Sequence, residues 1–252
     1  RVRGLITASE CERLIALARP QLEESGVALQ GGGQRHGFRT SSTAWVSTPE
    51  DPALVKLTLR VAELLKLPVS ALLVAEGPDA GKLQVVHYHE GQQYGVHHDC
   101  NGLIRRYVTV LFYLNDVPAG GETVFPAAGD DARRWAGLQT ADEAISAFLS
   151  DEHKQVETEL LGGRGGGRGG GGAGRGGGGR GGAGAGRGGV SVSPRKGDAV
   201  IWYNYSEHGA LEPRAVHCAM PVTKGEKWAA NMFIAITPAE LLEMDGLNGG
   251  SA

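Results

Sequence analysis

The stretch LQVVHYHEGQQYGVHHD, residues 83–99, ends in His97, His98 and Asp99. Because side chains two apart on an extended strand point to the same face, His97 and Asp99 can reach one point in space while His98 turns away. A second histidine, His217 in AVHCAMP, lies far downstream. Two imidazoles and one carboxylate form the ligand set that suits non-haem Fe(II) and leaves positions open for other ligands. His97, Asp99 and His217 are therefore the candidate metal ligands.

A competing pair of histidines precedes this motif. His87 and His89 also share a strand face, and Gly81 lies six residues before His87, as in a cupin metal motif. A cupin site needs a glutamate a few residues after the second histidine, but Gln93 and Tyr94 occupy that region. The sequence therefore favours His97 and Asp99 over the earlier pair.

Several separate motifs occur in a fixed order around the candidate ligands. This order and spacing resemble the prolyl 4-hydroxylase family of Fe(II)/2-oxoglutarate dioxygenases, and the plant and algal members look most similar. The resemblance runs from about Leu5 to Ile236, apart from one glycine-rich insert. Besides the opening stretch, the matching segments are ECERLIALARPQLEESGV, RTSSTAW, RRYVTVLFYLNDVPAGGETVFP, RKGDAVIWYN and HCAMPVTKGEKWAANMFI.

The resemblance implies roles for four further residues. Lys227 follows a short turn after His217, so it can face the same cavity and anchor the distal carboxylate of 2-oxoglutarate by charge-assisted hydrogen bonds. Tyr88 and Thr123 are implied as hydroxyl donors in the co-substrate pocket. Arg106 matches the family's substrate-side arginine, although the adjacent Arg105 leaves the register open by one residue.

The implied reaction is hydroxylation of peptidyl proline at C4, with O2 and 2-oxoglutarate consumed, succinate and CO2 released, and L-ascorbate keeping the iron reduced. The implied substrate is a proline-rich wall or extracellular glycoprotein in the polyproline II form. Family resemblance also suggests the endoplasmic reticulum. Two alternatives stay open: a peptide- or RNA-binding module without turnover, and the same chemistry on another substrate, because fold does not fix substrate.

The secondary structure expected to position these residues is mainly helical in the first part of the chain and mainly β-strand from residue 83. Amphipathic patterns predict helices from about Thr7 to Pro20 and from Pro52 to Leu67, which would brace a sheet. From residue 83, short runs separated by Gly, Pro and Asn predict strands. The predicted strands are Phe38–Val46, Leu83–His89, Val96–Asp99, Tyr107–Asn115, Glu122–Phe125, Val190–Ser193, Ala199–Tyr203, Ala215–Val222 and Trp228–Ile236.

This pattern predicts an α+β fold dominated by β structure, a distorted double-stranded β-helix or jelly roll with flanking N-terminal helices. We expect one prolyl 4-hydroxylase-like catalytic domain over residues 1–252, with helical support in residues 1–80 and the jelly-roll core in residues 81–236. On strand Ala199–Tyr203, Trp202 and Tyr203 are expected in the barrel core rather than in a pocket wall.

An insert of residues 162–189 interrupts the strands and consists almost only of Gly, Arg and Ala, after a predicted short helix at Asp142–Leu149. It has no apolar face to bury, so a disordered surface loop is expected. One interpretation is an RGG-like segment that contacts RNA. The other is a low-complexity insertion, tolerated because lengthening a flexible loop costs little. The insert lacks interleaved aromatic residues, which favours the second interpretation.

Composition limits the remaining possibilities. The 252 residues are 41% hydrophobic, enough for a sizeable core, and the net charge of -3 argues against a globally basic nucleic-acid binder. Three cysteines do not make a disulfide-rich scaffold, and buried thiols are the expectation. The chain begins with Arg1, so any signal peptide or membrane anchor is expected to lie upstream of it. Oligomeric state is left open.

Overall fold

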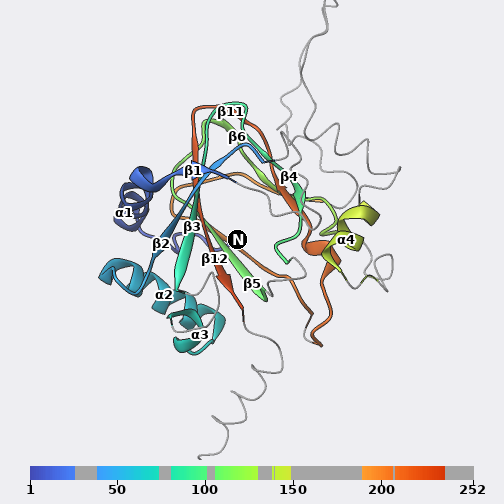
Figure 1. The fold of residues 1–252 in the computed structure, drawn as a ribbon, viewed down its shortest axis with the longest axis horizontal. Helices are drawn as coiled ribbons and strands as arrows, with labels where there is room; N and C mark the ends of the chain where they lie inside the picture. Colours follow the sequence, from blue (N-terminus) through green and yellow to red (C-terminus); the bar gives the residue numbers. More distant parts are fainter. Residues whose placement is uncertain are drawn as a thin grey trace, which may run out of the picture.

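A computed structural model of the chain describes residues 1–25, 39–73, 81–100, 106–129, 138, 140–148, 189–206 and 208–235. Its strands form two main antiparallel sheets, and strands that follow one another in sequence mostly alternate between them. This alternation is the jelly-roll arrangement that the sequence predicts, and helices flank the sheets (Figure 1).

The larger sheet has six strands in the order β1-β2-β3-β12-β5-β9. Their bounds are Glu23–Glu24 (β1), Ser42–Ser47 (β2), Lys82–Tyr88 (β3), Lys227–Ile234 (β12), Val108–Tyr113 (β5) and Ala199–Tyr203 (β9). The smaller sheet has the order β4-β10-β7-β8, with bounds Tyr94–His97 (β4), His217–Ala219 (β10), Thr123–Phe125 (β7) and Val190–Val192 (β8). A two-stranded ribbon joins Val222–Lys224 (β11) to Ala119–Gly120 (β6).

Two N-terminal helices pack on the outer side of the larger sheet (Figure 1). Helix α1, Ala8–Ala18, begins with a capping box between Thr7 and Glu10, and α2, Pro52–Leu65, begins with Asp51 accepting from two backbone N–H groups. Their buried apolar side chains join one core with those of the sheet, among them Leu14, Leu54, Leu57, Val85 and Val110. The helices thus brace the sheet, as expected.

Four further short helical elements lie within the described residues. Ser70–Leu73 (α3) follows α2, Ala141–Phe148 (α4) contacts β4, and 3-10 turns occupy Arg19–Gln21 (η1) and Pro213–Ala215 (η3). No helix within the described ranges is long and apolar enough to cross a membrane.

The structure corrects several predicted boundaries. The strand predicted as Ala215–Val222 is two strands, because the chain turns at Met220 and Pro221 between β10 and β11. The strand predicted to end at Asp99 ends at His97, and Asp99 lies in the bend beyond it. Tyr203 is 50% exposed, so its expected place in the core was wrong, whereas Trp202 is buried. The disorder expected for the insert is not tested, because residues 162–188 lie outside the described ranges.

Candidate metal and co-substrate site

The three candidate ligands come together between two neighbouring strands. His97 is the last residue of β4 and His217 is the first of β10, and the two are direct partners across the antiparallel ladder. Their ring centroids lie 4.2 Å apart. Asp99 reaches the same place from the bend after β4, so the predicted convergence is correct although its strand geometry is not.

One oxygen of Asp99 faces both rings. Asp99 Oδ1 lies 3.8 Å from Nε2 of His97 and 3.8 Å from Nε2 of His217, and all three ligand atoms lie within 4.8 Å of one another. The other ring nitrogens are already engaged: Nδ1 of His97 bonds the Gly95 carbonyl at 2.8 Å, and Nδ1 of His217 bonds the Ala215 carbonyl at 2.9 Å. A carbonyl only accepts, so each Nδ1 carries the proton and each Nε2 presents a lone pair.

Burial sets the charge of the group. Burial and the neighbouring His217 hold the pKa of His97 well below its usual value, so its imidazole is neutral. Burial alone raises the pKa of Asp99, but His217, His97 and Arg106 outweigh it and the net pKa is lowered. A neutral imidazole beside an ionised carboxylate is the protonation state that a metal ligand needs.

A chain of buried hydrogen bonds orients Asp99, and no pattern in the sequence indicates it. Thr109 on β5 donates its hydroxyl to Asp99 Oδ2 at 2.7 Å, which leaves Oδ1 for the histidines. Asn204 in turn donates to the Thr109 hydroxyl oxygen at 3.0 Å. Thr109 and Asn204 are both fully buried. Such supporting hydrogen bonds fix the orientation of metal ligands.

His98 turns away from the site, as predicted. Its Nδ1 accepts from the Cys100 backbone N–H at 3.1 Å, so its Nε2–H donates to the Glu212 carbonyl at 3.1 Å. Burial lowers the pKa of His98 to about 4, and the residue is a neutral structural histidine. The described cysteines Cys11, Cys100 and Cys218 are all free and buried, as the composition suggested.

Lys227 is the first residue of β12 and is only 2% exposed. Its ammonium donates to the Gly121 carbonyl at 2.7 Å and lies 5.3 Å from the centroid of the Tyr88 ring. Burial lowers the pKa of Lys227 to about 8. A buried ammonium with spare donors is a strong anchor for a carboxylate, so Lys227 has the environment that the predicted role requires.

Hydroxyl groups surround Lys227. Tyr88 is its direct partner across the β3–β12 ladder, and burial raises the pKa of Tyr88 to about 12. Thr123 on β7 accepts a hydrogen bond from the Tyr113 hydroxyl at 2.8 Å, so its own proton is free to point elsewhere. Tyr113, which the sequence reading did not single out, lies 5.7 Å from the Lys227 ammonium, measured to its ring centroid.

Two arginines line the same cavity. Arg106 stacks on Phe233 at 3.6 Å and donates to the Asp99 carbonyl at 3.2 Å. Arg39 lies 4.7 Å over the ring of Tyr94, which itself stacks on His97 with centroids 3.6 Å apart. Arg106 therefore lies beside the candidate ligands, as predicted, while Arg105 lies outside the described residues.

One open cavity joins these groups. It lies between the two sheets, and its wall contains every candidate site residue predicted from the sequence. The lining residues are Arg39, Val86, Tyr88, Tyr94, His97, Asp99, Arg106, Leu111, Thr123, Trp202, His217, Cys218, Ala219, Lys227, Ala229 and Asn231. Trp202, expected in the core, thus also forms the pocket wall and packs against His217 with centroids 4.7 Å apart.

Comparison with known proteins agrees with this site. The model of the 2OG-Fe(II) oxygenase superfamily matches residues 83–235, more than half of the chain and all of the cavity wall except Arg39. This chain belongs to the 2OG-Fe(II) oxygenase superfamily.

Among relatives of this oxygenase, probable prolyl 4-hydroxylase 4 of Arabidopsis thaliana is 30% identical over 92% of the chain and 65% of the relative. Prolyl 4-hydroxylase 2 of the same plant is 30% identical over 96% of the chain and 69% of the relative. The chain thus spans about two thirds of the length of these relatives, and the resemblance seen in the motifs is confirmed.

Solved structures agree with the fold. The 2OG complex of a viral collagen prolyl hydroxylase from Paramecium bursaria Chlorella virus 1 matches with a TM-score of 0.53 and 19% identity, over 92% of this chain and 93% of that one. A Trichoplax adhaerens prolyl hydroxylase in complex with a hypoxia inducible factor peptide fragment matches with a TM-score of 0.51 and 13% identity, over 96% and 84% of the two chains. At these identities the likeness shows the double-stranded β-helix fold alone.

The residues present fit the groups that the superfamily name implies. Two imidazoles and one carboxylate, each oriented by a second hydrogen bond, are a donor set for Fe(II). The buried Lys227 ammonium in the same cavity suits a dicarboxylic acid. The oxygenase therefore has candidate positions for both its metal and its co-substrate.

Proposed function

We propose that this oxygenase is a prolyl 4-hydroxylase that acts on peptidyl proline. The observation that carries the proposal is a single cavity with His97, Asp99 and His217 in its wall together with the buried Lys227. The similarity to plant prolyl 4-hydroxylases over more than nine tenths of the chain supports the choice of substrate class.

In this proposal His97, Asp99 and His217 hold Fe(II), which supplies the oxidative chemistry with O2 when it is bound. Thr109 keeps the carboxylate of Asp99 turned so that Oδ1 faces the histidines. The apolar wall that Trp202 and Phe125 form against His217 keeps water from this part of the cavity.

Lys227 anchors the distal carboxylate of 2-oxoglutarate. Tyr88 and Thr123 line the same cavity, and in this proposal their hydroxyls complete the set of donors for that carboxylate. The ammonium carries three protons, and within the described part of the chain it donates one of them to the Gly121 carbonyl, so donor capacity is left for a ligand.

Arg106 lies on the peptide side of the site, where its guanidinium is half-buried and reaches the cavity. We propose a proline-rich polypeptide in the extended polyproline II form as the substrate, with L-ascorbate keeping the iron reduced. We also propose the endoplasmic reticulum as the compartment, on the resemblance to plant and algal relatives alone.

The test is mass spectrometry of proline-rich peptides incubated with the protein, Fe(II), 2-oxoglutarate and ascorbate. The expected result is a gain of one oxygen on proline, coupled to succinate release and lost in His97→Ala and Asp99→Ala. Turnover retained in both variants would remove the iron assignment. Succinate release without hydroxyproline on any peptide would instead favour the same oxygenase chemistry on another substrate.

The binding-module alternative is tested by deleting residues 162–189. If the insert contacts RNA, deletion removes nucleic-acid affinity while peptide hydroxylation continues. If the insert is only a tolerated low-complexity segment, deletion changes neither property.

A further inference from the structure

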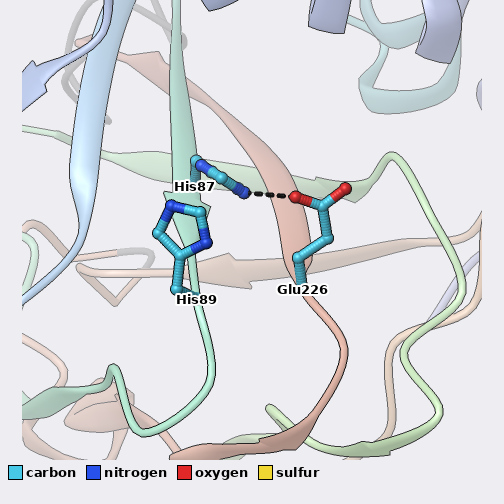
Figure 2. A group of neighbouring side chains, drawn as sticks. All are labelled: His87, His89 and Glu226. Carbon is cyan, nitrogen blue, oxygen red and sulfur yellow. Dashed lines mark hydrogen bonds and ion pairs between the residues drawn. The ribbon is translucent and has the colours of Figure 1, made fainter.

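A second cluster of metal-ligating side chains lies outside the cavity. His87 and His89 on and just after β3 meet Glu226, the residue before β12 (Figure 2). One ligand atom from each lies within 4.8 Å of the other two, as in the triad of the main site. We propose that these three residues bind a divalent transition metal ion, with zinc as the probe ion, at a site that does not depend on the proposed function.

Strand alternation places this cluster on the opposite face of the sheet from the co-substrate pocket. Tyr88 and Lys227 are ladder partners and line the cavity, so their sequence neighbours point the other way. His87, His89 and Glu226 are not among the residues of the cavity wall. An ion bound by them would therefore be separate from the triad, although it would tie together the strand ends that carry Tyr88 and Lys227.

The geometry of the cluster is held in place before any ion binds. The His87 ring stacks on Trp228 with centroids 4.0 Å apart, and its Nε2 lies 2.7 Å from Oε2 of Glu226. The His89 ring packs edge-on against His87 with centroids 4.3 Å apart. Figure 2 shows both rings on one side and the Glu226 carboxylate reaching toward them from the neighbouring strand.

The backbone around Glu226 is equally constrained. Asn115 donates to the Glu226 carbonyl at 2.8 Å and accepts from the Trp228 N–H at 2.7 Å. Its side chain thus fixes the backbone on both sides of Lys227. Glu90 accepts from the Gly225 N–H at 2.7 Å and joins the two turns. Ligands on constrained backbone lose little freedom on binding an ion.

Two imidazoles and one carboxylate are a zinc donor set that leaves further coordination positions for water. His89 is exposed and the Glu226 side chain is 46% exposed, which gives an ion a path from solvent. The ion would take the place of the proton in the hydrogen bond between His87 and Glu226, and it would neutralise the charge of Glu226. The guanidinium of Arg19 lies 5.0 Å from the Trp228 ring, and its positive charge opposes the binding of a metal cation.

Zinc binding is measured by equilibrium dialysis of the full chain, with metal counted per chain. Zinc also fits the iron triad, so wild type is expected to bind about two equivalents at saturation. His89→Ala and Glu226→Gln are each expected to lose about one equivalent, whereas His208→Ala, which changes an exposed histidine outside both clusters, loses none. A zinc content unchanged in His89→Ala and Glu226→Gln, or lowered as much in His208→Ala, overturns the proposal.

A second measurement separates the two sites. In His97→Ala, zinc is expected to raise the melting temperature because it binds the folded chain through the remaining cluster. The rise is expected to disappear in the double variant His97→Ala, His89→Ala, and its persistence there contradicts the proposal. His89→Ala alone is expected to keep wild-type 2-oxoglutarate turnover. Zinc content therefore tests the zinc site, and turnover tests the proposed function separately.

Discussion

The hydroxyl of Thr109 and the carboxylate of Asp99 are joined by a hydrogen bond of 2.7 Å between β5 of the larger sheet and the bend after β4. The bond occupies Oδ2 of Asp99 and leaves Oδ1 facing His97 and His217, at 3.8 Å from each Nε2. The orientation of one candidate ligand thus depends on a residue of the opposite sheet.

Removal of the Thr109 hydroxyl should weaken metal binding. We expect Thr109→Val to lower Fe(II) affinity about 10- to 100-fold, since that is the usual effect of losing a hydrogen bond to a ligand. Thr109→Ser keeps the hydroxyl and should restore most of the affinity. Thr58→Val removes another fully buried hydroxyl, on α2, and is the matched control for stability. Equal Fe(II) affinity in Thr109→Val and wild type, measured by anaerobic titration, would contradict this role.

Binding of 2-oxoglutarate should depend on the charge of Lys227. The pKa of Lys227 is about 8 in the folded chain, so the ammonium loses its proton as pH rises through that value. A neutral amine no longer attracts a carboxylate, so affinity for 2-oxoglutarate should fall above about pH 8. Lys227→Met should bind 2-oxoglutarate weakly and without this pH dependence, while Lys224→Met, at an exposed lysine, should behave as wild type. Calorimetric titration between pH 6.5 and 9.5 measures both effects.

The same lysine should affect stability without ligands. Its pKa falls from 10.5 to about 8 on folding, a shift that corresponds to about 3 kcal/mol against the charged form. Below about pH 8 the lysine is charged in both the folded and the unfolded chain, so the folded chain carries the full cost of burying the charge. Between about pH 8 and 10.5 the unfolded chain binds more protons than the folded chain, so the free energy of unfolding rises with pH. Lys227→Met should be more stable than wild type at pH 7 and should lack this rise. Urea unfolding of both proteins across this pH range measures the free energy of unfolding. If the wild-type value does not rise with pH, the assignment is refuted.

Arg106 should affect the peptide more than the co-substrate. Its guanidinium lies over Phe233 at 3.6 Å and reaches the cavity beside Asp99, whereas Lys227 is the residue that we propose as the anchor for 2-oxoglutarate. We expect Arg106→Met to raise the KM for a proline-rich peptide about tenfold or more, the effect of one charge-assisted contact, with a smaller change in the KM for 2-oxoglutarate. Arg195→Met, at an exposed arginine, is the control. A larger rise in the KM for 2-oxoglutarate than for peptide would place Arg106 elsewhere in the mechanism.

Gly120 should not tolerate a side chain. Its φ of +77° costs an L-residue about 1–2 kcal/mol, and a Cβ there would lie 2.3 Å from the Pro221 carbonyl oxygen. At Gly121, which has a similar φ of +71°, the nearest atom to a Cβ is Cδ of the Lys227 side chain at 3.3 Å, a much milder contact than the one at Gly120. Gly120→Ala should therefore lower the melting temperature more than Gly121→Ala does. If Gly121→Ala lowers the melting temperature more than Gly120→Ala, the described backbone of this turn is wrong.

The sequence alone determined which residues form the main site. Residue types and spacing identified the candidate metal ligands, because strand periodicity is local. The resemblance to a known family in the order of the motifs indicated the role of Lys227. The same periodicity predicted most strands to within a few residues. Periodicity failed where the backbone geometry depends on distant partners. At His97, for example, β4 ends and Asp99 lies in the bend that follows.

Only the tertiary structure decided how those residues are supported. Thr109 lies on β5 and Asn204 directly follows β9 of the same sheet. Both support a ligand that comes from the other sheet, and no spacing in the sequence marks them. Glu226 lies 139 residues from His87 and completes a cluster that the linear pattern disfavoured, because a cupin motif has its glutamate a few residues after the second histidine. Contacts across a β ladder join positions of any sequence separation, and for that reason they appear only once the chain is folded.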